Sequence, residues 1–224
     1  MGQTVSLIGS SGLVGSKILE LLLQDDRFSS INLLVRKQPK REHPKIRVIK
    51  MDFSDEKAYQ DAVKGSEAVF CSVGTTNKKV EGDKDEYRKV DFDIPVFAAR
   101  AAAACGAYSF GLVSSVGANP DNNANFYLKL KGVTEEAVCK EHIPQIVLLR
   151  PSILLGERKE SRFGESIGKG IAAVASPLLF GSAKKYRGIK AVDVAKAMIS
   201  ATQKLPKGIH VLEYPEMMNM IGKK

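Results

Sequence analysis

The sequence has 224 residues, of which 44% are hydrophobic, and carries a formal net charge of +9. This length and composition predict one domain with a sizeable core and leave too little chain for two full domains. The basic charge is scattered, with its densest stretch from Arg36 to Lys50, which favours a solvated basic surface over a nucleic-acid site.

The cysteines and histidines are few and dispersed. Cys71, Cys105 and Cys139 have no disulfide-framework or metal-type spacing, so we expect reduced, mostly buried thiols and no metal site. The start of the sequence lacks the charged and apolar regions of a secretory signal. The most apolar later stretch, residues 170–181, contains Pro177 and is shorter than the roughly twenty residues of a membrane span. These features predict a cytoplasmic protein without a transmembrane segment.

Strand-length apolar runs alternate with helix-length segments along the chain. Apolar residues follow helical spacing in residues 13–22 and cover most of the predicted helix 94–104. This alternation predicts an α/β fold, a Rossmann-type doubly wound parallel sheet flanked by helices. The predicted strands are residues 4–8, 31–35, 46–49, 68–72, 109–114 and 146–149.

After Arg150 the pattern loosens. A charged loop at 157–162 and a Gly-containing apolar segment precede a predicted helix at 191–202 and a short strand at 210–213. We therefore expect residues 1–224 to form a single NAD(P)-binding Rossmann domain, in which residues 151–224 contribute a small substrate-side segment.

The string GSSGLVG lies between the first predicted strand and the first predicted helix. Residues without a Cβ allow a sharp turn, close approach of a pyrophosphate and tight helix packing. The helix that follows offers free N–H groups and a positive dipole end to phosphates. The string predicts a dinucleotide-binding turn made of Gly9, Ser10, Ser11, Gly12, Leu13, Val14 and Gly15.

The residues after the second strand discriminate between the two dinucleotides. An NAD site usually has a carboxylate there, whereas NADP needs a cation for its 2′-phosphate. The chain has Arg36 and Lys37 there. These cations favour NADP(H) over the alternative, in which they belong to a plain basic loop and the cofactor is NAD. Asp52 and Phe53 follow the third strand. They are equally well interpreted as contacts of the adenine or as structural residues, a helix cap and a buried aromatic.

Tyr127 and Lys131 are four residues apart in a segment with helical pattern, so they share one helix face. A phenol is a poor acid-base group at neutral pH, but a neighbouring ammonium stabilises its phenolate. Ser114 and Ser115 close the fifth strand, where a hydroxyl can stabilise a developing alkoxide. These residues predict a catalytic site for coupled proton and hydride transfer.

The Tyr-x-x-x-Lys spacing alone is weak evidence, since Tyr186 and Lys190 have it too. Gly188 lies between those two residues, and no strand ending in Ser precedes them. The first pair, Tyr127 and Lys131, is therefore the better catalytic candidate.

In this order, these motifs resemble the short-chain dehydrogenase/reductase superfamily. A closer resemblance is carried by the strings SVGTT, VDFD, SSVGA, YLKLKG and RPSILLGERKESRFGE. Over nearly the whole chain, they look like the atypical Tat-interacting-protein-like oxidoreductase branch of that superfamily. Val116 departs from the pattern, because the animal relatives have Lys there.

The resemblance implies NADPH as cofactor and a catalytic set of Ser115, Tyr127 and Lys131, with Ser114 as the alternative to Ser115. Tyr127 would act as acid-base residue, and Lys131 would hold the nicotinamide ribose. The same resemblance implies that the cofactor is bordered by Gly74, Thr75 and Pro151.

Some questions stay open at this stage. Pro151 has a second interpretation as a residue that simply ends a strand. The later charged loop is either a substrate-side ion network or a solvated loop, and its residues are Glu160, Ser161, Arg162 and Glu165. The substrate and the choice between a monomer and a homodimer are not fixed by the sequence.

Three functions are compatible with the motifs to different degrees. The first is an NADPH-dependent carbonyl reductase acting on a small-molecule carbonyl substrate. The second is an NADPH-binding, redox-sensing protein that acts through a protein partner. A sugar-nucleotide epimerase is the weakest, because about seventy residues after the sixth strand are few for a substrate domain.

Overall fold

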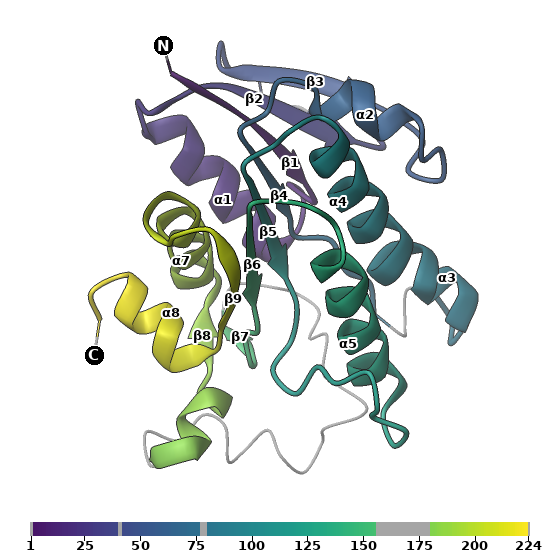
Figure 1. The fold of residues 1–224 in the computed structure, drawn as a ribbon, viewed down its shortest axis with the longest axis vertical. Coiled ribbons are helices and arrows are strands. Elements are labelled where there is room, and N and C mark those ends of the chain that lie inside the picture. Colours follow the sequence, from purple (N-terminus) through teal and green to yellow (C-terminus); the bar gives the residue numbers. More distant parts are fainter. Residues whose placement is uncertain (1, 40–41, 77–79, 156–179, 224) are drawn as a thin grey trace.

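The central sheet has seven parallel strands in the order β3-β2-β1-β4-β5-β6-β9 (Figure 1). The structure is a computed structural model that describes residues 2–39, 42–76, 80–155 and 180–223. The strands are β1 (Gln3–Ile8), β2 (Phe28–Val35), β3 (Ile46–Lys50), β4 (Ala68–Cys71), β5 (Ser109–Val113), β6 (Gln145–Leu149) and β9 (Gly208–Leu212), and a separate parallel pair is formed by β7 (Leu154–Leu155) and β8 (Ile189–Lys190).

Helices cover both faces of the sheet, as Figure 1 shows. One face carries α1 (Leu13–Gln24), α7 (Ala191–Lys204) and α8 (Tyr214–Met220), and the other carries α2 (Ala58–Val63), α4 (Ile94–Ala104) and α5 (Phe126–Cys139). Between β4 and α4 the chain forms α3 (Lys84–Arg88) and then a π-helix, η2 (Lys89–Asp93). A 3₁₀-helix, η3 (Gly181–Tyr186), precedes β8.

The core is divided by the sheet into two clusters, because successive side chains of a strand point to opposite faces. In β4, Phe70 packs in the cluster beneath α1 and α7, whereas Val69 and Cys71 pack in the cluster beneath α4 and α5. Every residue of β4, β5 and β6 is buried, as expected for parallel strands with helices on both sides.

The carboxyl ends of β2, β1 and β4 lie side by side. Ile8 of β1 is in register with Leu34 of β2 and with Cys71 of β4. From β1 the chain runs outward through β2 and β3 and then returns to β4 on the other side of β1. This reversal creates the crevice in which ligands bind in doubly wound sheets.

The predicted Rossmann-type fold is confirmed, and each predicted strand is present with its ends shifted by at most a few residues. The π-helix and the β7–β8 pair were not predicted. The cysteine prediction was partly wrong, since Cys71 is buried while Cys105 and Cys139 are only partly buried.

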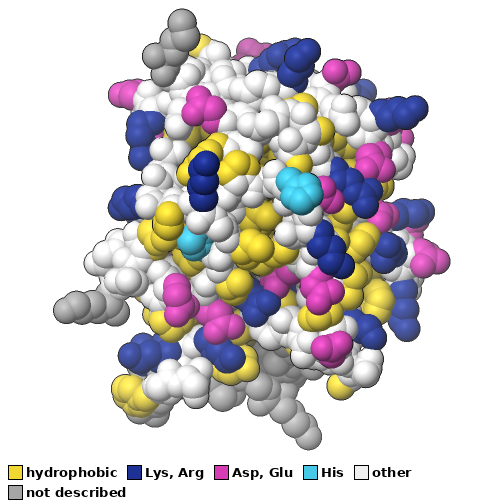
Figure 2. Space-filling view, in the orientation of Figure 1, with side chains coloured by type: hydrophobic (Ala, Val, Ile, Leu, Met, Phe, Trp, Pro, Cys, Tyr) yellow, Lys and Arg dark blue, Asp and Glu magenta, His cyan; other side chains and the backbone are white. Residues whose placement is uncertain are grey.

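The charged side chains form no single patch on the face seen in Figure 2. Lys and Arg alternate there with Asp and Glu around an apolar middle (Figure 2), in agreement with the scattered charge of the sequence. None of the helices in the described part of the chain has the length and apolar character needed to cross a membrane.

Candidate functional site

The glycine turn at the end of β1 has a shape that only small residues allow. Gly9 has a φ of +88°, and a Cβ on it would lie 2.8 Å from the backbone carbon of Ser72. A Cβ on Gly15 would lie only 2.1 Å from the carbonyl oxygen of Gly9. The turn therefore needs glycine at both positions, the first for its backbone angle and the second for close packing.

The amino end of α1 faces this turn without a side-chain cap. Gly12 is the N-cap residue and has no side chain to accept from the first amide groups. Ser10 and Ser11 occupy the turn, and Leu13 and Val14 begin the helix. Uncapped N–H groups together with the helix dipole suit the pyrophosphate of a dinucleotide.

Arg36 and Lys37 come directly after β2 and are exposed. The register of Ile8 with Leu34 brings this strand end next to the glycine turn. Neither side chain forms an ion pair within the described part of the chain. Two cations are thus available beside the dinucleotide turn.

Asp52 and Phe53 follow β3 and both make structural contacts. The Oδ1 of Asp52 accepts hydrogen bonds from the backbone N–H and the hydroxyl of Ser54, which lower the pKa of the Asp52 carboxyl. The Phe53 ring packs edge-on against Tyr59, with ring centres 5.9 Å apart. Asp52 thus closes a local turn and does not cap α2, whose N-cap is Lys57, and Phe53 is only partly buried. The exposed Asp52 remains a candidate for the adenine side.

Gly74 and Thr75 lie in the segment after β4, beside the glycine turn. The backbone N–H of Thr75 donates to Oδ2 of Asp91 at 2.7 Å, and the hydroxyl of Tyr87 donates to the carbonyl of Thr75 at 3.2 Å. These bonds from η2 and α3 fix the course of the segment.

Ser114, Ser115 and Pro151 are brought together by the pairing of β5 with β6. The N–H of Ser114 donates to Leu149 at 2.7 Å, and the N–H of Val116 donates to the carbonyl of Pro151 at 3.0 Å. Both serines and Pro151 are buried. They form one wall at the carboxyl end of the sheet.

Tyr127 and Lys131 supply the opposite wall from the first turns of α5. The helix begins after Asn125, whose side chain accepts from the N–H of Leu128 at 3.1 Å. Lys131 Nζ lies 5.9 Å from the centre of the Tyr127 ring and 2.8 Å from Oδ1 of Asp91. Tyr186 and Lys190 instead lie in η3 and β8, so they share no helix face.

A small cavity joins these two walls. Its volume is about 20 Å³, enough for roughly one water molecule. The hydroxyl oxygen of Ser114 is buried and has no hydrogen-bond partner among the described residues. The lining residues are Val113, Ser114, Ser115, Tyr127, Lys131, Pro151, Ser152 and Leu154.

The sequence analysis missed two residues of this region. A Cβ on Gly132 would lie 2.2 Å from the backbone nitrogen of Pro120, so this glycine lets the chain that follows Ser115 pack against α5. A glycine inside a predicted helix was the available signal. Asp91 was quoted only within a family string, and its contact with Lys131 depends on the tertiary fold.

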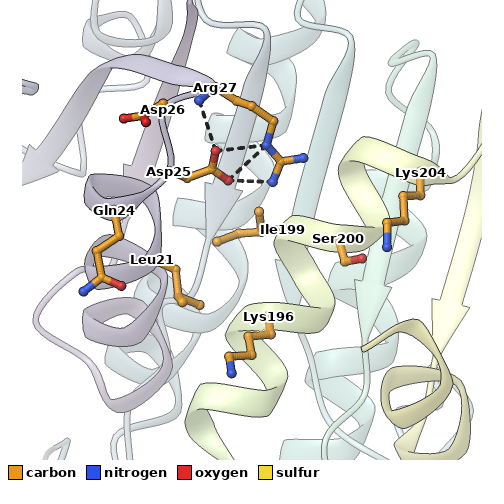
Figure 3. A pocket seen from close by; sticks show the side chains of 9 residues that line it. All are labelled: Leu21, Gln24, Asp25, Asp26, Arg27, Lys196, Ile199, Ser200 and Lys204. Atoms are coloured by element: carbon orange, nitrogen blue, oxygen red, sulfur yellow. Dashed lines mark hydrogen bonds and ion pairs between the residues drawn. The ribbon is translucent and has the colours of Figure 1, made fainter. Parts of the chain in front are cut away.

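A larger hollow lies elsewhere, between α1 and α7 (Figure 3). It has a volume of about 630 Å³ and is lined by polar and charged side chains together with Leu21 and Ile199. Arg27 is held there by hydrogen bonds to Asp25 (Figure 3). None of the predicted site residues lines this hollow, so its size does not make it the catalytic site. The loop with Glu160 to Glu165 lies outside the described residues.

The sequence model of a known protein family matches most of the chain. Residues 9–204 match the sequence model of a family described as NAD(P)H-binding. The chain belongs to this NAD(P)H-binding family. The matched region extends from the glycine turn to the end of α7, so family membership covers all the site residues named above.

Relatives within the family confirm the resemblance to Tat-interacting-protein-like oxidoreductases. "Protein FMP52-1, mitochondrial" of Scheffersomyces stipitis is 33% identical over 88% of this chain and 87% of its own length. "Protein HTATIP2" of Rattus norvegicus is 32% identical over 75% of this chain and 69% of its own length.

The cytoplasmic prediction was wrong. Related FMP52 proteins from several fungi, among them Candida albicans, carry names that place them in mitochondria. The prediction rested on the lack of a recognisable N-terminal signal, and such a pattern does not reveal every route into an organelle.

Solved structures support the fold of the family. The chain superimposes on "MoeE5 in complex with UDP-glucose and NAD" with a TM-score of 0.66 and 15% identity, covering 97% of this chain and 80% of the other. A UDP-N-acetylglucosamine 4-epimerase from Methanobrevibacter ruminantium superimposes with a TM-score of 0.69 and 18% identity, covering 95% of this chain and 76% of the other. At identities this low, the likeness shows a shared Rossmann-type fold alone.

Proposed function

We propose that the protein is an NADPH-dependent carbonyl reductase with Ser115, Tyr127 and Lys131 as its catalytic residues. The observation that carries the proposal is one cavity that all three side chains line at the carboxyl end of the sheet. It lies at the same end of the sheet as the glycine turn, so a dinucleotide held at that turn reaches the cavity with its nicotinamide end.

The residues around the crevice fit NADP(H). The turn from Gly9 to Gly15 offers a cradle that a Cβ would fill, and the uncapped end of α1 offers N–H donors for the pyrophosphate. Arg36 and Lys37 supply the charge that a 2′-phosphate requires. When bound, the reduced cofactor supplies the hydride for reduction of a carbonyl carbon. The adenine side falls to Asp52 and Phe53. Gly74 and Thr75 border the cofactor after β4, and Pro151 borders the nicotinamide.

The chain itself supplies the proton and holds the oxygen. Tyr127 donates its phenolic proton to the carbonyl oxygen as that oxygen gains negative charge. Lys131 stabilises the phenolate that this transfer leaves behind and binds ribose hydroxyls through its other N–H donors. The buried position of Lys131, 3% exposed, strengthens this electrostatic contribution.

The two serines have different environments. Ser115 donates only a local bond of 3.3 Å, to the carbonyl of Val116, and can exchange it for the substrate oxygen. Ser114 has no hydrogen-bond partner among the described residues and is the alternative donor. We expect Ser115→Ala to lower turnover more than Ser114→Ala.

Replacing Tyr127 with Phe is the direct test of this function. We expect Tyr127→Phe to abolish NADPH oxidation with a panel of ketones and aldehydes and to leave NADPH binding, followed by fluorescence, nearly unchanged. The matched control is Tyr186→Phe, which alters the second Tyr-x-x-x-Lys pair, is 42% exposed and should keep full turnover.

Two outcomes would contradict the proposal. Turnover that survives in Tyr127→Phe would remove Tyr127 from the catalytic role. NADPH binding without turnover of any panel member would favour the alternative, a redox-sensing protein, and capture of a partner that depends on NADPH would then identify that role.

A further inference from the structure

β9 is an edge strand whose outer side has no neighbour in the described part of the chain. It ends the sheet, and β6 is the strand with which it pairs. The carbonyl of Leu212 accepts from the N–H of Arg150, which continues β6, so Leu212 turns its backbone groups toward β6. Successive residues of a strand turn these groups to opposite sides. The N–H and C=O groups of Ile209 and Val211 therefore point outward from the sheet.

The side chains of the same two residues are exposed although they are apolar. Ile209 is 54% exposed and Val211 is 43% exposed. They lie in register with Ile146 and Leu148 of β6, which pack in the core cluster beneath α4 and α5. β9 lies near the middle of the view in Figure 1, and hydrophobic side chains gather at the same place in Figure 2. β9 thus extends the apolar face of β6 beyond the cover of the helices.

The two edges of the sheet differ in their charges. The strand at the opposite edge, β3, carries the exposed Arg47 and Lys50. Charged side chains on an edge strand oppose its pairing with another chain. β9 contains no Lys, Arg, Asp or Glu, and the charged residues Lys207 and Glu213 lie just outside its two ends. Of the two edges, the β9 edge is therefore the one open to another strand.

We propose that β9 pairs antiparallel with β9 of a second copy of this chain, about a two-fold axis at His210. In this register Ile209 exchanges both backbone hydrogen bonds with Val211 of the second copy, and their β-branched side chains meet on the apolar face. Lys207 of each copy then lies opposite Glu213 of the other. The contact forms one sheet that continues through both copies, and it does not depend on the proposed catalytic function.

The charges at the ends of β9 are the reason for choosing a second copy over a foreign strand. Lys207 is exposed and forms no ion pair within the described part of the chain. Glu213 caps α8 and lies 3.9 Å from Lys185, and a carboxylate accepts several donors. A two-fold axis brings each residue of one copy to its counterpart in the other. A cation at one end of the strand and an anion at the other are therefore matched by symmetry.

The first test is the mass of the full chain in solution. By sedimentation equilibrium at about 100 µM, which detects a Kd up to that range, we expect about twice the 24.4 kDa of one chain. Val211→Lys sets ammonium groups into the contact and should give monomers. Val211 is exposed, so this variant should fold, as circular dichroism can check. The matched control is Phe126→Lys, which changes an apolar residue of α5 that is 40% exposed and should leave the dimer intact.

A second measurement tests the register by cross-linking. On the axis, the two copies of residue 210 form a non-hydrogen-bonded pair with Cα atoms about 4.5 Å apart, a distance that a disulfide can span. We expect His210→Cys to give a covalent dimer when copper–phenanthroline is added as oxidant. Lys207→Cys is the control on the same edge, because position 207 lies about 20 Å from its own copy in this register. Neither Lys207→Cys nor the wild type should cross-link.

The outcomes that would overturn this inference do not involve turnover, so they leave the proposed function untouched. A wild-type mass of one chain at that concentration would exclude the dimer. A dimer that persists in Val211→Lys, or one that is lost in folded Phe126→Lys, would place the interface elsewhere. Equal cross-linking of Lys207→Cys and His210→Cys would refute the two-fold register.

Discussion

At the scale of single residues, discrimination between the two dinucleotides depends on the exposed cations after β2. Arg36 and Lys37 project from the strand end beside the glycine turn. A guanidinium can bind a phosphate through two parallel N–H bonds, whereas an ammonium acts as a point charge. Arg36 is therefore the main candidate for recognition of the 2′-phosphate.

We expect Arg36→Ala to raise the Kd for NADPH about tenfold to a hundredfold, the loss of one or two charge-assisted hydrogen bonds. The Kd for NADH, measured by the same titration calorimetry, should barely change. The control is Arg47→Ala, an exposed arginine of β3 in the same basic stretch. An equal loss of affinity for both dinucleotides would show that Arg36 does not read the phosphate.

At the scale of elements, an ion pair fastens the end of β6 to α5. Glu135 of α5 is 4% exposed and accepts from the guanidinium of Arg150 through both carboxylate oxygens. These bonds raise the pKa of Arg150. Arg150 precedes Pro151, and Glu135 lies one turn after Lys131, so the pair holds the two walls of the cavity at a fixed distance.

Breaking this pair should destabilise the protein measurably. We expect Glu135→Gln to lower the free energy of unfolding by about 2 kcal/mol, because it leaves a half-buried guanidinium without its counter-ion. Glu56→Gln removes one of the two carboxylates that pair with the exposed Arg100, the other being Glu141, and should cost less than about 1 kcal/mol. Urea denaturation of both variants measures the difference, and equal costs would show that the Glu135 pair contributes no more than a surface contact.

At the scale of the whole molecule, the sheet connects all the parts that we assign to the site. The glycine turn follows β1, the cations follow β2, the serines follow β5, and Pro151 follows β6. One continuous sheet with helices on both faces should unfold as one unit, which supports the proposal of a single domain.

We therefore expect one cooperative thermal transition in differential scanning calorimetry. NADPH at about one hundred times its Kd should stabilise the folded state by about 2.7 kcal/mol, which raises Tm by roughly 5 to 10 °C for a chain of this size. Two separate transitions, with only one of them responding to NADPH, would contradict the single domain.

The sequence by itself determined the sheet, the dinucleotide turn and the Tyr127–Lys131 pair. These features depend on local patterns: apolar runs, glycines at a fixed spacing, and two residues four apart on a helix. Tyr127 and Lys131 could be distinguished from Tyr186 and Lys190 because Gly188 interrupts the second pair.

Only the tertiary structure decided what surrounds that pair. Asp91 is forty residues before Lys131 in the sequence, and no local pattern links a π-helix after α3 to the second turn of α5. The contact exists because the helices that follow β4 and β5 pack on the same face of the sheet. Gly132 is equally dependent on packing, since its need for a missing Cβ comes from Pro120 in a different segment.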